Sequence, residues 1–391
     1  VWSITADGTS VNLSTFEQLG CRFGTTFDSF ETKFQHPTTG EDVFIIAEPC
    51  HMLKLARNAL AFLGTIIDPE GEEIQWNYFK QLHTLQEKQG LKMANKISAN
   101  HIKFEKHKMN VRLAAQTLSS SVADAIEFLD IGMKNPNFKN SNGTVKFVRI
   151  IDRLFDMLNS RNPVGKGYKH PLRLANKATY EEIRRSTAEY LLSLKTNSTQ
   201  SQLLATHRRK TFIVGFVANI KSTIEMANQM FSTPTHPFKY LLTYKYLQDH
   251  LELLFSCIRA RGGWNNNPNC LQLKYALRQM MMKNAIAASK NGNCLDFADN
   301  TYTLIPIFHN RKHKSPLSEV STQDSRYECT NAMEEAEESL MFEHLNQNTH
   351  SDFISNILFY IGGFIVSKLI KKLTCQACKD SLLGSSMATV A

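Results

Sequence analysis

The stretch from Tyr240 to Gly263, YLLTYKYLQDHLELLFSCIRARGG, decides the interpretation of this chain. Its apolar residues recur at three- and four-residue steps, which predicts one amphipathic helix with a single buried face. The residues of this face are Leu242, Tyr246, Leu247, Leu251, Leu254 and Ile258. Asp249 and Glu252 lie about one turn apart, so their carboxylates should project from nearly the same side. Such a pair suits a divalent cation near a phosphate, although an ordinary solvated face more often explains such a pair on a single helix.

The composition limits the class of protein. A chain of 391 residues is long enough for two or three domains, and a hydrophobic fraction of 42% is that of a globular protein. The net charge of +9 favours an anionic partner, nucleic acid ahead of a membrane. The longest apolar run, Ile357 to Ile370, is too short for a bilayer span, which takes about 20 residues. Eight scattered cysteines do not form a disulfide framework, which indicates a reducing compartment.

The beginning of the chain follows an α/β pattern. A short strand is expected at Val1–Thr5, and it ends in a turn at Asp7. Asn12–Leu19 fits a short helix, Val43–Ala47 a second, buried strand, and Glu48–Leu63 a turn that leads into a longer helix. An acid just past the end of a strand stands where open α/β sheets place functional groups, although Asp7 alone could equally be a turn residue.

The middle of the chain is dominated by helical periodicity. Helices are predicted at Trp76–Gln89, Asn100–Leu129, Val145–Asn159, Tyr180–Leu194 and Leu271–Ala288. An α/β unit followed by such a run suggests an insertion that splits a domain. Residues 290–350 have the composition of a linker, expected to be partly disordered. Near the end, Cys375 and Cys378 form half of a zinc tetrad, which leaves a split zinc site and two unligated thiols as alternatives.

Four motifs in a fixed order carry a resemblance to a known family. They are Thr5–Ser10 with Leu19–Cys21, Glu48–Asn58, Gln248–Pro268, and Tyr360–Val366 with Lys368 and Leu369. Together they resemble the P-element-type DNA transposases, including the THAP-domain transposases, over nearly the whole chain.

The resemblance implies an architecture of the α/β plus α class. This is a partial ribonuclease H-like fold, interrupted by a large all-helical insertion domain and followed by a helical C-terminal segment. The first strands of that fold would precede Val1. The expected segments are a first ribonuclease H-like segment at 1–70, the insertion at 71–235, a second ribonuclease H-like segment at 236–290, a linker at 291–350 and the C-terminal helical segment at 351–391.

The resemblance also implies metal-dependent DNA cleavage and strand transfer. Three carboxylates then hold two divalent ions, Mg²⁺ or Mn²⁺, that stabilise the attacking and leaving oxygens. Asp7 matches the second acid and Glu252 the third, so both are expected to be catalytic and to bind metal, with their carboxylates roughly 4–8 Å apart. The first acid would precede Val1. Glu48 stands where relatives usually carry Asp, and we interpret it as a polar residue at a strand end rather than a ligand.

In this family the insertion binds guanine nucleotides. The residues that match the family's nucleotide contacts are Lys96, Val111, Ser119, Phe155, Asp156 and Asp249. Lys96 and Ser119 would hold phosphates, Phe155 would stack on the base, and Asp156 would accept from the guanine edge. No GxxxxGK[ST] loop occurs. Asn110 replaces a lysine of the family pattern and Asp152 an asparagine, so an insertion that only positions DNA remains an alternative.

Three functions follow from these observations. The first is a nuclear transposase core whose partners are the DNA of transposon ends and GTP, with no membrane, and for which a homo-oligomer is allowed. The second is a domesticated, catalytically inactive DNA-binding protein derived from such a transposase. The third, a generic helical scaffold, is disfavoured because it would make four motifs in family order a coincidence.

Overall fold

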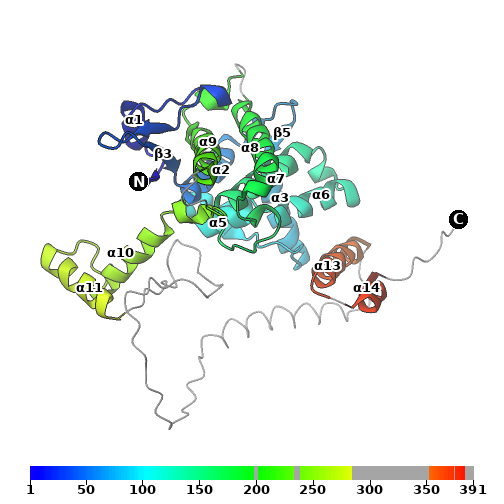
Figure 1. The fold of residues 1–391 in the computed structure, drawn as a ribbon. Coiled ribbons are helices and arrows are strands. Elements are labelled where there is room, and N and C mark those ends of the chain that lie inside the picture. The colour runs from blue at the N-terminus through cyan, green and yellow to red at the C-terminus, as the bar shows by residue number, and fades with distance from the viewer. Residues whose placement is uncertain (198–200, 233–237, 284–351, 374, 384–391) are drawn as a thin grey trace, which may run out of the picture. The chain divides into compact units, whose positions relative to one another are not determined.

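The computed structural model describes residues 1–197, 201–232, 238–283, 352–373 and 375–383 (Figure 1). It divides into two units, each described by itself below. The larger comprises Val1–His83 and Lys96–Ile305, and the smaller comprises Thr84–Asn95 and Pro306–Ala391. The expected linker at 291–350 lies outside the described residues.

A three-stranded sheet begins the larger unit. Strand β1 (Ser3–Ala6) runs parallel to β3 (Asp42–Ala47), and β2 (Lys33–Gln35) pairs antiparallel with the other edge of β3. Helix α1 (Ser10–Gln18) follows β1. Residues 43–47 of β3 are buried on both faces, as a central strand with parallel pairing requires. Both predicted strands and the short helix between them are confirmed.

Two helices far apart in sequence pack on this sheet. Helix α2 (Pro49–Leu63) follows β3 directly, and α9 (Thr211–Ser232) lies beside both of them (Figure 1). The amide of Asn219 in α9 donates to the carbonyl of Ala47 at 2.6 Å and accepts its N–H at 2.7 Å. Gly215 allows this close approach, because a Cβ there would lie 2.1 Å from the Met52 sulfur. Although α9 falls within residues 71–235, it therefore packs on the sheet.

A second small sheet corrects one expectation. Strand β4 (Thr65–Ile67) lies between β5 (Glu73–Gln75) and β6 (Lys195–Thr196), all antiparallel. Since β5 and β6 fall within 71–235, that segment is not all helical. These strands have two or three residues each, too few to produce a periodic signal in the sequence.

The helical part of the larger unit matches the predicted helices with one exception. Its helices are the first part of α3 (Asn77–Gln89, whose residues from Thr84 on belong to the smaller unit), α4 (Ala99–Ile102), α5 (Val111–Thr117), α6 (Ser120–Glu127), α7 (Asn142–Leu158) and α8 (Lys177–Leu192). The single helix predicted at Asn100–Leu129 is wrong. Asn110 accepts the Leu113 N–H at 3.0 Å and starts α5, while Ser119 is extended and starts α6. Each of these caps interrupts the helix before it.

The stretch Tyr240–Gly263 is helical only in its second half. Helix α10 spans Asp249–Arg261, and a 3₁₀ turn spans Thr243–Tyr246. The Thr243 hydroxyl donates to the Met157 carbonyl at 2.7 Å and accepts the Ser160 N–H at 3.0 Å, which holds this segment away from a helical path.

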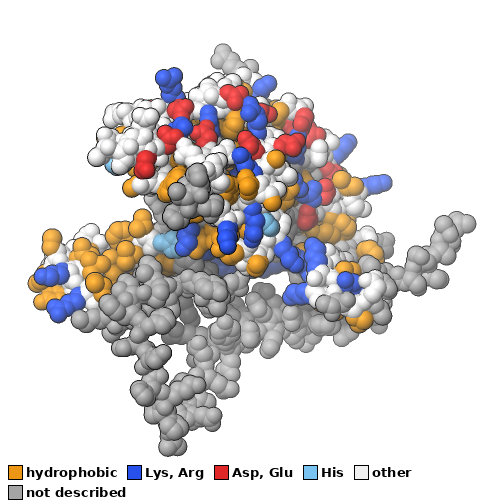
Figure 2. All heavy atoms as spheres, in the orientation of Figure 1, with side chains coloured by type: hydrophobic (Ala, Val, Ile, Leu, Met, Phe, Trp, Pro, Cys, Tyr) orange, Lys and Arg blue, Asp and Glu red, His pale blue; other side chains and the backbone are white. Residues whose placement is uncertain are grey.

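The predicted buried face of this stretch is partly wrong. Leu251 of that face is 51% exposed, as is Phe255, which the prediction did not include. Ile258 is buried as predicted and packs, together with Cys257, against Ala276 and Met280 of α11 (Cys270–Lys283). Hydrophobic side chains consequently gather on the surface of α10 and α11 (Figure 2).

The smaller unit contains α13 (Asp352–Ile370) and α14 (Gln376–Leu383). Among the described residues, no helix is long and apolar enough to cross a membrane. Cys375 and Cys378 are exposed, and neither belongs to a group of three candidate metal ligands in the described ranges.

Candidate active site

Two acids lie at one edge of the first sheet. Because β1 and β3 are parallel with Ala6 opposite Ala47, Asp7 and Glu48 follow the carboxyl ends of neighbouring strands. The Glu48 N–H donates to the Ala6 carbonyl at 2.8 Å, which fixes this register. The Asp7 carboxylate accepts from the Asn12 amide at 2.5 Å. The strand ends thus hold both acids at the position where open α/β sheets carry functional groups.

The start of α10 reaches the same edge. The Thr5 hydroxyl donates to the Tyr246 carbonyl at 2.8 Å, and the Gln248 amide donates to the Thr5 carbonyl at 3.3 Å. These contacts bring the first turn of α10, with Asp249 and Glu252, to the end of β1 across more than 240 residues of sequence. The separation of the Asp7 and Glu252 carboxylates stays a prediction.

Asp249 and Glu252 have different surroundings although they share one turn. Asp249 is 7% exposed, and Arg161 donates to its Oδ2 atom at 2.9 Å. Burial raises the pKa of Asp249, and the Arg161 guanidinium opposes that rise. Glu252 is exposed. A solvent-facing carboxylate can bind an ion or a phosphodiester-bound metal, whereas Asp249 is already engaged inside the protein.

Sequence reasoning did not identify Arg161 as a member of this site. Its partner Asp249 is 88 residues away, and no local pattern marks the pair. It also did not identify Cys50, whose sulfur lies 3.9 Å from the Asp249 Oδ1 atom. For Cys50 a signal existed, since it follows the strand-end acid Glu48 within the second motif.

Helix α7 carries two of the predicted nucleotide contacts. Phe155 is only 7% exposed, so most of its ring faces the core. Asp156 is half-buried, its Oδ1 atom 3.7 Å from the Lys169 ammonium. Burial raises the pKa of Asp156 to about 6.

The other predicted contacts lie around α5 and α6. Lys96 is exposed, and Val111 is buried at the first position of α5. Ser119 precedes α6, and its hydroxyl donates to the Gln116 carbonyl at 2.9 Å. The Asp152 carboxylate accepts the Ser120 N–H at 3.1 Å and also its hydroxyl. A carboxylate therefore already occupies the start of α6, where a phosphate would find backbone donors.

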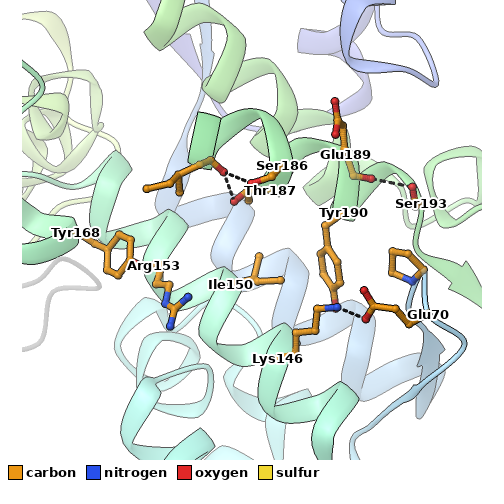
Figure 3. Close-up of a pocket in the computed structure, with 12 residues that line it drawn as sticks. Glu70, Lys146, Ile150, Arg153, Tyr168, Ser186, Thr187, Glu189, Tyr190 and Ser193 are labelled. Carbon is orange, nitrogen blue, oxygen red and sulfur yellow. Dashed lines mark hydrogen bonds and ion pairs between the residues drawn. The ribbon is translucent and has the colours of Figure 1, made fainter. Parts of the chain in front are cut away.

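A separate surface pocket of about 540 Å³ lies between α7 and α8 (Figure 3). Lys146 forms an ion pair with Glu70 and lies 5.3 Å from the centre of the Tyr190 ring, while Arg153 lies 5.2 Å from the centre of the Tyr168 ring. None of the predicted nucleotide contacts lines it.

Three family models match the chain. The GTP-binding insertion domain of TNP-like proteins matches residues 50–171, and the C-terminal RNase H domain of these proteins matches residues 244–278. The C-terminal domain of DNA transposase THAP9 matches residues 349–390.

Individual relatives agree with these models. The chain is 28% identical to human DNA transposase THAP9 over 397 residues, which cover 99% of this chain and 42% of that protein. It is 23% identical to the Drosophila melanogaster Transposable element P transposase over 355 residues, 87% of this chain and 42% of that protein. The chain thus spans less than half the length of both relatives.

A solved structure has a similar fold. The Drosophila P element transposase strand transfer complex aligns with a TM-score of 0.58 and 23% identity, covering 73% of this chain and 61% of that one. The class is therefore that of transposases with an RNase H-like domain and a GTP-binding insertion domain. Within it, this chain belongs to the P-element-type transposase family, as the four motifs predicted.

Proposed function

We propose that this chain belongs to a DNA transposase that cleaves DNA and transfers strands with the help of divalent metal ions. The observation that carries the proposal is the contact of Thr5 with Tyr246 and Gln248, because it brings the strand-end acid Asp7 to the turn that holds Glu252. Asp7 and Glu252 are the proposed catalytic residues.

The donor atoms suit the ions that the family uses. Carboxylate oxygens are the ligands that Mg²⁺ and Mn²⁺ prefer, and Asp7 and Glu252 would hold such ions. The ions would supply charge stabilisation for the attacking and leaving oxygens. The chain's own contribution is positional: β1 fixes the backbone of Asp7, Asn12 orients its carboxylate, and α10 presents Glu252 toward solvent.

The test separates cleavage from binding. Glu252→Gln, in a protein that includes the segment upstream of Val1, should reduce Mg²⁺-dependent DNA cleavage by at least about a hundredfold, because the amide keeps the shape and loses the charge. DNA affinity should hardly change. Asp28→Asn, an exposed acid paired with Arg185, is the matched control and should cleave normally. Normal cleavage by Glu252→Gln would contradict the assignment.

Residues 1–391 alone should bind DNA without cutting it. The reason is that a two-metal cage takes three carboxylates, and the resemblance assigns the first of them to the upstream segment. Robust metal-dependent cleavage by residues 1–391 would instead mean that Glu48 or Asp249 completes the cage, and that the acids were wrongly assigned.

The remaining assignments follow from the family. The proposed partners are the DNA of transposon ends and GTP, and the proposed location is the nucleus. A homo-oligomer is compatible with these partners. The proposed nucleotide contacts are Lys96, Val111, Ser119, Phe155 and Asp156 on the insertion and Asp249 on the second RNase H-like segment. The proposed domains keep the boundaries given from the sequence. Guanine would be selected by Asp156, since its carboxylate can accept from the N1 and N2 edge that adenine lacks.

A specific observation favours the domesticated protein as the second candidate. Asp249 forms an ion pair with Arg161, and the Asp152 carboxylate accepts the Ser120 N–H at the start of α6, next to Ser119. A nucleotide that contacts Asp249 and Ser119 would have to compete with these two interactions. A chain that binds DNA but neither GTP nor Mg²⁺ or Mn²⁺ would support this candidate.

A further inference from the structure

A second group of candidate ligands lies beside Asp7 and Glu252. Glu48 and Cys50 stand on either side of Pro49 at the start of α2, and Asp249 is the first residue of α10. One ligand atom from each of these three side chains lies within 4.8 Å of the other two. All three residues are at most 7% exposed. Neither Asp7 nor Glu252 belongs to this group in the described part of the chain, so the donors are distinct.

One oxygen in the group lacks a partner. The Oε2 atom of Glu48 accepts the His51 N–H and thereby caps α2. Its Oε1 atom is buried, and no hydrogen-bond partner for it exists among the described residues. A buried carboxylate oxygen without a hydrogen-bond donor is costly, because its desolvation is then only partly compensated, here by the charge of Lys54. A bound cation would satisfy it.

We propose that Glu48, Cys50 and Asp249 form a buried Zn²⁺ site that joins the first turn of α2 to the first turn of α10, in which Asp249 is a metal ligand in place of a nucleotide contact. A thiolate with two carboxylates suits Zn²⁺, whereas Mg²⁺ takes oxygen ligands in octahedral geometry. The site is therefore separate in chemistry from the proposed catalytic ions. It also ties together two segments that are 199 residues apart.

The observed spacing is compatible with this metal. The Cys50 sulfur lies 3.9 Å from the Asp249 Oδ1 atom. In a tetrahedral site with Zn–S of about 2.3 Å and Zn–O of about 2.1 Å, the two donor atoms are about 3.6 Å apart, so only a small adjustment is needed. A solvent molecule would complete the four ligands.

Arg161 holds one of the ligands in place. It donates to the Oδ2 atom of Asp249, which leaves the Oδ1 atom toward Cys50. Carboxylates that bind metals are commonly oriented by such an outer hydrogen bond. On binding, the Cys50 thiol releases its proton to solvent and forms a Zn–S bond, and no group changes oxidation state.

The experiment uses Co²⁺ as a spectroscopic substitute for Zn²⁺ in residues 1–391. The protein is first changed to Cys375→Ser/Cys378→Ser, so that the exposed cysteine pair cannot contribute. We expect a thiolate-to-cobalt charge-transfer band that Zn²⁺ removes and excess Mg²⁺ does not. Cys50→Ser should abolish it, while Cys21→Ser, which removes another buried thiol, should leave it intact.

A second variant keeps the test decisive if Cys50→Ser does not fold. Glu48→Gln still accepts the His51 N–H and so preserves the cap, yet it loses the charged ligand. It should weaken Co²⁺ binding by at least about tenfold, since even outer-shell changes cost 10–100-fold. Absence of the band, or a band unchanged in folded Cys50→Ser or Glu48→Gln, would overturn the proposal. Neither result affects the Mg²⁺-dependent cleavage test of Glu252.

Discussion

At the scale of single residues, Asp156 is the acid whose ionisation is most open to measurement. Burial raises its pKa from the ordinary 3.8 to about 6, with Lys169 acting in the opposite direction. At pH values between these two pKa values, the Asp156 carboxyl is largely protonated in the folded protein and largely ionised in the unfolded chain. Stability therefore falls as pH rises from about 4 to about 6, because the folded state must keep a partly buried charge.

Asp156→Asn should remove this contribution. As pH rises from about 4 to about 6, the Tm of Asp156→Asn should rise relative to the Tm of the unaltered protein. Above about pH 6 the difference between the two Tm values should stay constant. Thermal unfolding at a series of pH values measures it. A pH-independent difference for Asp156→Asn would mean that Asp156 ionises normally.

The same residue bears on nucleotide choice. Asp156→Asn should erode a preference for GTP over ATP, because its amide presents a donor to the guanine N1–H instead of an acceptor. Binding of both nucleotides to the unaltered protein, compared by calorimetry, gives the reference. Equal and immeasurably weak binding of both would leave the insertion as a scaffold for DNA.

At the scale of elements, α9 depends on one side chain for its place on the sheet. Asn219→Leu would leave the buried N–H and carbonyl of Ala47 without their partners, since Asn219 pairs with both. Each lost partner costs about 1–3 kcal/mol, so the free energy of unfolding should fall by about 2–6 kcal/mol in urea denaturation. Ser232→Ala, at the exposed end of α9, should change it by less than about 0.5 kcal/mol. A change of that small size for Asn219→Leu would show that α9 is held by its apolar contacts alone.

The elements also show what the sequence could predict. The strands β1 and β3 and the helix α2 were predictable because burial patterns and turn residues act locally. The path of residues 240–248 was not, because its apolar spacing favours a helix while Thr243 is bound to Met157 and Ser160. Short strands such as β4 exist only through pairing with β5 and β6.

The candidate site divides in the same way. The resemblance predicts Asp7 and Glu252 as site residues, and the strand–turn pattern placed Asp7 at the end of a strand, where the structure has it. The ion pair of Arg161 with Asp249 and the contact of Cys50 with Asp249 depend on the tertiary fold, with 88 and 199 residues between the partners. Pairings at such separations leave no local pattern in a single sequence.

At the scale of the whole molecule, the net charge of +9 predicts salt-sensitive DNA binding. With about three phosphates neutralised, the slope of log affinity against log salt would be about −2.7, or roughly a forty-fold loss between 50 and 200 mM salt. Arg259→Gln, an exposed cation at the end of α10, should make the slope shallower by about 0.9. Arg185→Gln, which is paired with Asp28, is the control and should leave it unchanged. Affinity independent of salt would exclude backbone-phosphate contacts as the main source of binding.

The pairing of Asn219 with Ala47 also has a consequence for how the protein is made. The two residues are 172 positions apart, and a ribosome adds about 5–20 residues per second. On the order of 10–30 s therefore pass between the synthesis of β3 and the synthesis of α9, the helix that packs on it. During that interval the face that α9 covers is open to other segments of the nascent chain, such as the one that carries Leu172, or to a chaperone. Nascent chains stalled between α2 and α9 should therefore be the ones that chaperones hold longest and that proteases degrade first.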